Sequence, residues 1–342
     1  MSVNRPITIV GGGLAGLALA AGLRRSLVPV TVHEAGSYPR HRVCGEFLSG
    51  LRQETLKNLG IESCFDDAAS HNSVRWFQKG ARISDHQLPE PAMALSRYRL
   101  DRRLCEHVRE LGALVIEKSR LPHRLEEGTV WAAGRVPRKG EWIGLKCHVT
   151  GGLELESELE MHLGTNGYVG MAEVEDGRIN VCGLFRLDRS LRGSKAGALL
   201  LSYLGCGGHS SLVERLLQST VDEESCCAMA GFALGWQRET PGQLAIGDAE
   251  AMIAPFTGNG MTMAFQSAEL AVPLLVDWSR GRLTWQNCQS EIREKLQGMF
   301  RRRMVVSCAV NPLLVRPVAQ KWIGAFARRG LVPVRSLLEL VR

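Results

Sequence analysis

The sequence predicts an α/β protein in which a parallel-sheet nucleotide-binding domain is interrupted by an antiparallel β-sheet and followed by C-terminal helices. Three observations lead to this fold class. A strand, a glycine turn and a helix open the chain, a second glycine-rich segment follows more than 200 residues later, and segments of alternating polarity lie between them. A chain of 342 residues is long enough for about two structural units with sizeable cores.

The N-terminal segment has the pattern of a Rossmann-type unit. The apolar, β-branched run Ile7–Val10 predicts a buried parallel strand, and residues 11–16 read G-x-G-x-x-G where this strand meets a helix. The three glycines permit a tight turn, close approach of a pyrophosphate and close helix packing. A second short strand ends at Glu34, 18 residues after the third glycine, where a carboxylate can bind an adenosine ribose. The alternative, a glycine-rich turn without a ligand, does not explain the accompanying strand, helix and glutamate.

The downstream segment carries a second set of signals for a nucleotide site. It contains Gly247-Asp248-Ala249 and then Pro255-x-x-Gly258-x-Gly260, after which we expect a helix. A helix N-terminus offers free N–H groups and a positive dipole end to the negative charge of a reduced flavin. Two sites in one chain imply one long cofactor held at both ends, which indicates FAD. The alternative is an ordinary loop and helix with Asp248 as the cap.

These segments, together with Arg42-Val-Cys44-Gly45-Glu46, make the chain resemble the FAD-dependent oxidoreductases that include geranylgeranyl reductases, p-hydroxybenzoate-type hydroxylases and flavin halogenases. The resemblance covers residues 5–60, 95–135 and 225–275. It implies that Asp248 binds the ribityl chain and that the segment from Gly258 to Met261 contacts the flavin near N1 and O2. It also implies that Arg97, in an R-x-x-L-D-x-x-L helix start, reaches the cofactor; the alternative is a capped helix whose arginines face water.

The expected cofactor contacts come from three parts of the chain. They are Gly11, Gly13, Leu14, Ala15, Gly16, Glu34, Ala35, Arg42, Cys44, Gly45, Arg97, Asp248, Pro255, Gly258, Gly260 and Met261. No catalytic residue is assigned, because the flavin performs the redox step. No metal site is expected.

Several residues near these motifs have two possible roles. Cys44 is either a reactive thiol, which needs a lowered pKa, or a small packing residue. Glu46 is either a desolvated proton donor or acceptor, or a surface residue. A histidine in the central sheet can deprotonate a phenol, or can be structural. The sheet residues with this ambiguity are His148, His162, Lys146 and Tyr168.

One departure from the family pattern concerns the electron donor. Ala133 stands where relatives have an aspartate that touches both FAD and the nicotinamide. We expect an NAD(P)H-driven monooxygenase acting on a hydrophobic or aromatic small molecule, with slow or substrate-dependent reduction. The alternatives are a C=C reductase of the geranylgeranyl reductase type and a non-catalytic flavin-binding protein. A halogenase is disfavoured, because its G-W-x-W-x-I-P segment is missing.

Composition and charge limit the possible partners. The net charge is +7, yet no basic motif with interleaved aromatics suggests nucleic-acid binding. Ten cysteines without C-x-x-C spacing, no signal peptide and no apolar run of about 20 residues predict a cytoplasmic location. The basic C-terminal region mixes cations with apolar residues. We favour packing on the domain, with peripheral membrane contact as the alternative.

The chain is expected to divide into three parts. Residues 1–60, 95–135 and 225–275 form a discontinuous FAD-binding domain, and residues 61–94 and 136–224 form the substrate-binding domain. Residues 276–342 form a C-terminal helical region. Within the substrate domain, strands are expected at 73–78, 142–149, 155–163, 167–174 and 178–185, followed by helices over 190–220.

Overall fold

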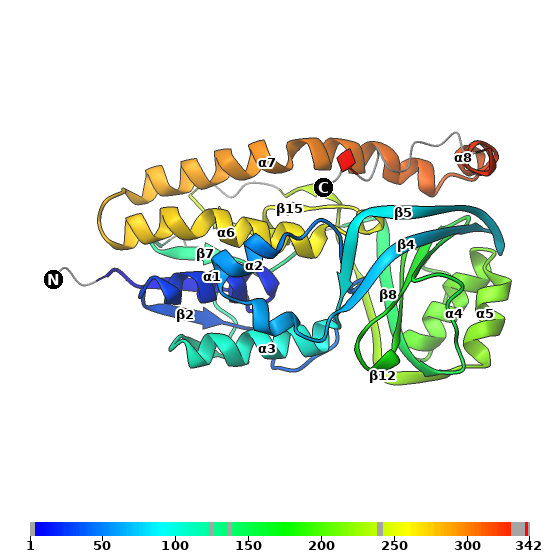
Figure 1. Ribbon diagram of the computed structural model, residues 1–342, viewed down its shortest axis with the longest axis horizontal. Helices are drawn as coiled ribbons and strands as arrows, with labels where there is room; N and C mark the ends of the chain where they lie inside the picture. Colours follow the sequence, from blue (N-terminus) through cyan, green and yellow to red (C-terminus); the bar gives the residue numbers. More distant parts are fainter. Residues whose placement is uncertain (1–3, 123–125, 136–138, 238–241, 330–338, 341–342) are drawn as a thin grey trace.

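The computed structural model describes residues 4–122, 126–135, 139–237, 242–329 and 339–340, and it confirms the predicted fold class. An α/β unit stands beside a curled, mainly antiparallel sheet, and the long helix α7 (Trp285–Leu314) runs along both (Figure 1). The chain crosses between the two units several times, so each unit is built from segments distant in sequence.

A five-stranded parallel sheet forms the centre of the α/β unit, in the order β14-β7-β1-β2-β6. Helix α1 packs against this sheet and against α6, and its residues 14–23 are all buried. Its small residues make this possible, because a Cβ on Gly16 would lie 2.0 Å from the carbonyl oxygen of Gly11. The elements of this unit are β1 (Ile7–Val10), α1 (Leu14–Arg25), β2 (Val30–His33), α2 (Gln53–Leu59), α3 (Arg97–Glu110), β6 (Leu114–Ile116), β7 (Thr129–Trp131), β14 (Leu244–Ala245) and α6 (Gly260–Ser279).

The second sheet has eight strands in the order β12-β8-β11-β10-β9-β4-β5-β3. All neighbours are antiparallel except β4 and β9. Helices α4 and α5 cover its outer face (Figure 1). The elements are β3 (Phe47–Leu48), β4 (Ala69–Gln78), β5 (Ala81–Ala94), β8 (Trp142–Gly151), β9 (Leu159–Leu163), β10 (Gly167–Glu173), β11 (Ile179–Arg186), α4 (Ala196–Cys206), α5 (Ser210–Leu217) and β12 (Thr220–Ala230).

Three expectations about this sheet were wrong in detail. The return to the FAD-binding domain was placed at residue 225, but β12 continues to Ala230 and pairs with β8 on both sides of an irregularity between Asp222 and Cys227. The polar run 220–225 conceals this strand, because its pairing with β8 rather than its own composition holds it in the sheet. The strand expected from residue 155 begins only at Leu159, and β3 joins this sheet although it lies within the first FAD-binding segment.

Two helices, α7 and α8 (Pro317–Arg328), lie within the part of the expected C-terminal region that the structure describes. Thr284 caps α7 by accepting a hydrogen bond from the backbone N–H of Asn287, and α8 follows a break at Arg316. Helix α8 packs on β5 and α7. β13 (Gly235–Trp236) and β15 (Ala251–Met252) pair as a two-stranded antiparallel ribbon, and β13 contacts α7. None of the helices among the described residues is long and apolar enough to cross a membrane.

Candidate functional site

The glycine turn between β1 and α1 leaves one side of the backbone open. Gly11 has φ +107° and lies against the backbone of Ala132 and Ala133, so a side chain there would collide. Gly13 is different, because the nearest atom to a Cβ added there would be the Arg97 guanidinium at 4.0 Å. Helix α1 begins directly afterwards with the buried Leu14. The turn therefore presents a helix N-terminus with an arginine opposite it, as a pyrophosphate requires.

Glu34 lies at the end of β2 and is buried beside the glycine turn. Its carboxylate accepts hydrogen bonds from the N–H of Gly12 at 2.9 Å and of Gly36 at 2.8 Å, and from Arg40 at 2.6 Å. Burial acts to raise the pKa of Glu34, but the Gly36 hydrogen bond and the neighbouring arginines hold it below its ordinary value. The carboxylate is therefore ionised, as an acceptor for a ribose must be. Ala35, which follows it, is exposed.

A buried aspartate links two of the predicted arginines. Asp101 is 0% exposed, and its carboxylate accepts hydrogen bonds from Arg97 at 2.7 and 2.8 Å and from Arg42 at 2.9 Å. Burial opposes the charge on Arg97, but Asp101 raises its pKa overall. Sequence reasoning did not single out Asp101, although its spacing of four residues from Arg97 on a helix was a usable signal. Its role is to hold both guanidinium groups at the glycine turn.

Asp248 lies within electrostatic reach of Arg97, in the short turn after β14. Among the described residues, none donates a hydrogen bond to its carboxylate. Burial raises the pKa of Asp248 to about 6, and the positive charge of Arg97 acts in the opposite direction. Gly247, with φ +61°, brings this turn against Ala15 of α1. A half-buried carboxylate without a donor fits the hydroxyl groups of a ribityl chain.

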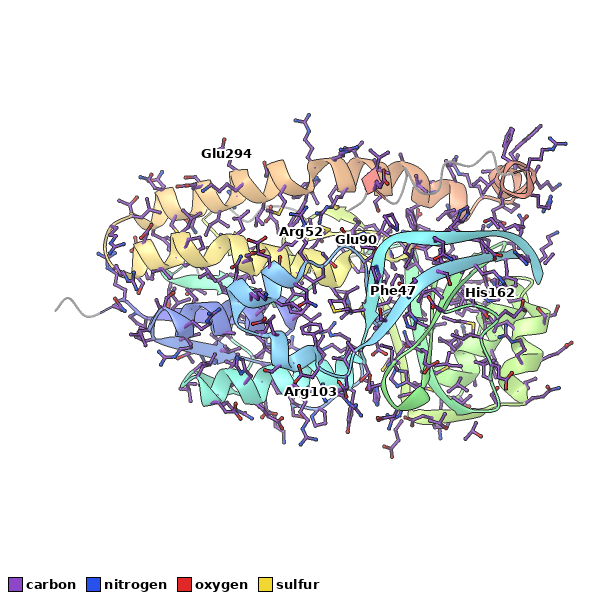
Figure 2. All side chains as sticks on the ribbon, in the orientation of Figure 1. Phe47, Arg52, Glu90, Arg103, His162 and Glu294 are labelled. Carbon is purple, nitrogen blue, oxygen red and sulfur yellow. The ribbon has the colours of Figure 1, made fainter. Side chains whose placement is uncertain are left out.

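The Cys44 segment and the start of α6 form one structural unit. The sulfur atoms of Cys44 and Met261 are 3.4 Å apart, and the Ser49 N–H donates to the carbonyl of Gly258 at 3.0 Å. Gly258 has φ +65°, and a Cβ there would lie 2.3 Å from the ring of Phe47. Figure 2 shows Phe47 at the junction between the α/β unit and the second sheet. Two segments more than 200 residues apart thus meet where the flavin ring is expected.

The remaining predicted contacts lie around this junction. Gly45 packs against the Phe47 ring, Pro255 is exposed at the start of a short turn, and Gly260 begins α6. The structure therefore brings the predicted residues together in two groups, one around the glycine turn and one where the Cys44 segment meets α6. Their contacts with a cofactor stay predictions.

Glu46 occupies a position that sequence reasoning left open. It is 0% exposed, so it is not a surface residue. One carboxylate oxygen contacts Lys146 Nζ at 3.1 Å, and the other contacts His148 Nε2 at 2.5 Å. Cys44 next to it favours the packing alternative, because burial raises the pKa of its thiol.

Two other candidates lie elsewhere. His162 pairs with Glu160 on β9 at 2.7 Å and stacks on Phe77, deep in the second sheet (Figure 2). The Tyr168 hydroxyl is buried and contacts Asn311 of α7 at 3.1 Å. Both polar side chains thus have hydrogen-bond partners within the protein, which favours the structural alternative for each.

The face of the second sheet that meets the Cys44 segment changes from polar to apolar along its length. Lys146, His148 and Asn180 lie at one end, and Tyr168 and Leu184 lie at the other. The first end of this face is therefore charged and the second is apolar. Strand alternation directs other apolar side chains away from this face: Ile143, Leu145, Val169 and Met171 point to the opposite face and pack with α4 and α5.

A cavity of about 340 Å³ opens beside the apolar end. Its lining includes Trp142, Phe232, Ala254 and Asn311. This volume lies within the range of small-molecule sites, roughly 300–1,000 Å³. The sequence indicated Trp142 but gave no signal for the contribution of α7.

Comparisons with known proteins agree with this geometry. A family model described as an FAD binding domain matches residues 4–149, and one described as squalene epoxidase matches residues 210–316. Over residues 4–149 the chain is thus similar to the FAD-binding domain of FAD-dependent enzymes. This confirms the resemblance seen in the sequence, and it supports FAD as the cofactor for which the site is built.

Curated relatives match over shorter stretches. A menaquinone reductase of Mycolicibacterium smegmatis is 29% identical over 140 residues, which are 40% of this chain and 33% of that protein. The 3-amino-4-hydroxybenzoate 2-monooxygenase PtmB3 of Streptomyces platensis is 32% identical over 98 residues, which are 27% of this chain and 24% of that protein. The chain thus matches a third or less of the length of these relatives.

Solved structures share the fold over nearly the whole chain. PqsL of Pseudomonas aeruginosa, a probable FAD-dependent monooxygenase, has a TM-score of 0.72 at 14% identity and covers 94% of this chain and 99% of its own. A geranylgeranyl bacteriochlorophyll reductase-like protein from Thermoplasma acidophilum has a TM-score of 0.75 at 16% identity and covers 98% and 95%. The fold therefore occurs in both a monooxygenase and a reductase-like protein.

Proposed function

We propose that this protein is an FAD-dependent monooxygenase that acts on a hydrophobic or aromatic small molecule, with NAD(P)H as electron donor. The observation that carries the proposal is the meeting of the Cys44 segment, the start of α6 and the mixed polar and apolar face of the second sheet. Such a face can hold an aromatic ring at one end and a hydroxyl or amino group at the other. PtmB3, which is named for an amino-hydroxybenzoate substrate, supports this substrate class.

The protein residues would bind and orient. Bound FAD would supply the redox chemistry. Arg97 and the glycine turn would hold its pyrophosphate, Glu34 its adenosine ribose and Asp248 its ribityl chain. The cavity beside Trp142 and Asn311 would admit the substrate to the apolar end of the sheet.

The second candidate is a C=C reductase. The Cys44-Gly45-Glu46 segment resembles the reductase branch, and three of the matching relatives are named menaquinone reductase. The third candidate is a non-catalytic flavin-binding protein. Relatives have an aspartate where this chain has Ala133, which is exposed after β7 and lies next to Gly11. Without that aspartate a contact to the nicotinamide is missing. Each candidate requires FAD.

The experiment that separates them follows NADPH oxidation with a panel of phenols, aminophenols and prenylated quinones, in air and without oxygen. Product formation only in air supports the monooxygenase, and turnover without oxygen supports the reductase. Flavin that neither turns over nor accepts electrons supports the binding protein. Cofactor released by heat is identified by chromatography, and FMN alone would refute the whole proposal.

Membrane contact and location are also proposals. Helix α8 exposes Trp322 (64%), Val318 and Phe326 beside the cations Lys321 and Arg328, a pattern that suits an anionic lipid surface. Flotation with phosphatidylglycerol vesicles tests the contact, and a Trp322→Ser variant that floats equally well would refute it. A cytoplasmic location rests on the scattered cysteines and stays a prediction.

A further inference from the structure

A buried polar cluster joins the Cys44 segment to strand β8. Glu46 has φ +58°, which turns its side chain from the backbone of the segment into the second sheet. Its Oε1 accepts from Lys146 Nζ at 3.1 Å and from the Arg97 N–H at 2.9 Å, while Oε2 contacts His148 Nε2 at 2.5 Å. Glu46, Lys146 and His148 are all 0% exposed. Three titratable groups therefore share one dry site.

The charge of Glu46 determines the tautomer of His148. Burial acts to raise the pKa of Glu46, but the His148 hydrogen bond and the Lys146 ammonium hold it below its ordinary value. An ionised carboxylate only accepts hydrogen bonds, so in neutral His148 the proton lies on Nε2 and the lone pair on Nδ1. Among the described residues, Nδ1 is buried and has no hydrogen-bond partner. The structure thus keeps a basic nitrogen free, at the cost of leaving a polar atom unsatisfied.

The surroundings of His148 provide a route to solvent. His41 lies edge-on to His148 with ring centroids 5.3 Å apart, and it stacks on the exposed Tyr98. Burial and the nearby Lys146 lower the pKa of His41 to about 4, so this ring is neutral near pH 7. The other charged or titratable groups that face the cluster from neighbouring elements are Arg97, Asp222, Cys44, Cys182 and Cys227.

The cluster is also coupled to the expected flavin position. Asn180, on the strand next to His148, donates to the Cys44 carbonyl at 3.0 Å, and Cys44 contacts Met261 of α6. A negative charge that forms at this junction lies against the same sheet face as His148. In a site from which water is excluded, such a charge favours a proton on a nearby base.

We propose that Glu46 and His148 form a proton-holding dyad that takes up one proton, at His148 Nδ1, when negative charge develops in the active site. This rests on the proposed binding of FAD but on neither of the proposed reactions. Two-electron reduction of the FAD-loaded protein by dithionite would add one proton and one net negative charge at the bound FAD. The second proton comes from solvent past His41 and makes His148 an imidazolium paired with the Glu46 carboxylate. Electrons and protons then balance at two each.

The test measures the midpoint potential of the FAD-loaded protein between pH 6 and 8, with dithionite as reductant. The expected slope for the unmodified protein corresponds to two protons per two electrons. In His148→Gln and Glu46→Gln, it falls to that for one proton. His162→Gln is the matched control, because His162 is also a buried histidine paired with a glutamate in this sheet. It should keep the slope of the unmodified protein.

Each outcome decides a separate point. A purified protein that takes up no FAD refutes the proposed function. FAD-loaded proteins with equal slopes in all four forms refute the dyad alone, because the flavin itself then accounts for every proton. Nitrogen-15 NMR of histidine-labelled, oxidised holoprotein gives a check that needs no variant. The dyad requires His148 with its proton on Nε2 near pH 7, and a proton on Nδ1 would overturn it.

Discussion

Replacing Asp248 by asparagine should strengthen the FAD-free fold and weaken FAD binding at the same time. Burial raises the pKa of this carboxyl from 3.8 to about 6, so the ionised form is disfavoured in the folded protein. Each unit of this pKa difference corresponds to about 1.4 kcal/mol. The whole difference would therefore cost about 3 kcal/mol of folding stability in a fully dry site. Solvent reaches part of the side chain, so we expect a cost of about 2 kcal/mol at pH 7. Asparagine has the same shape without this cost.

The sign of the pH dependence follows from the direction of the pKa change. A carboxyl whose folded pKa is raised costs nothing below about pH 4, where it is protonated in both states. The cost grows between about pH 4 and pH 6 and is constant above. The stability advantage of Asp248→Asn should therefore be largest at pH 7 and should shrink as the pH falls toward 4.

The cofactor should respond in the opposite direction. A hydrogen bond to a charged acceptor contributes roughly 1.5–3 kcal/mol, so losing it should weaken FAD binding about ten- to a hundredfold. Urea denaturation of the FAD-free forms at pH 7 and pH 4.5, with FAD titration of both proteins, measures the two effects. A variant that is less stable without FAD, or that binds FAD as tightly as the unmodified protein, would show that Asp248 is not a strained ribityl ligand.

Three further substitutions test the rest of the site. Gly258→Ala should destabilise the protein by more than about 1 kcal/mol in thermal unfolding and reduce flavin retention, because Gly258 has φ +65° and Phe47 fills the space beside it. The control is Gly298→Ala on the open surface of α7, which should stabilise the protein by about 0.5–1 kcal/mol. Asp101→Asn should cost roughly 3–5 kcal/mol in urea unfolding, since two half-buried arginines lose the buried carboxylate that they share; a loss under 1 kcal/mol would mean that the pair is solvated. Ala133→Asp should speed stopped-flow reduction by NADPH at fixed coenzyme concentration, and an unchanged rate would exclude this position as the missing nicotinamide contact.

The sequence by itself determined the fold class and the order of the cofactor motifs. Local rules suffice for these, because a β-branched run, a glycine turn and a small-residue helix specify a Rossmann-type unit within about 30 residues. The positions of Gly11, Gly16 and Gly258 were readable for the same reason: each has a backbone or packing requirement that only glycine meets.

Only the tertiary structure decided which distant groups meet. Glu46 and His148 are 102 residues apart, and nothing local distinguishes Glu46 from a surface glutamate. Its burial results from the pairing of β3 with β5, which carries the Cys44 segment onto the second sheet. The polar end of that face was missed for a related reason, because strand alternation assigns faces but does not say which face meets the cofactor domain. Long-range pairing determines that choice, and in this protein it places the charged residues of β8 beside the expected flavin.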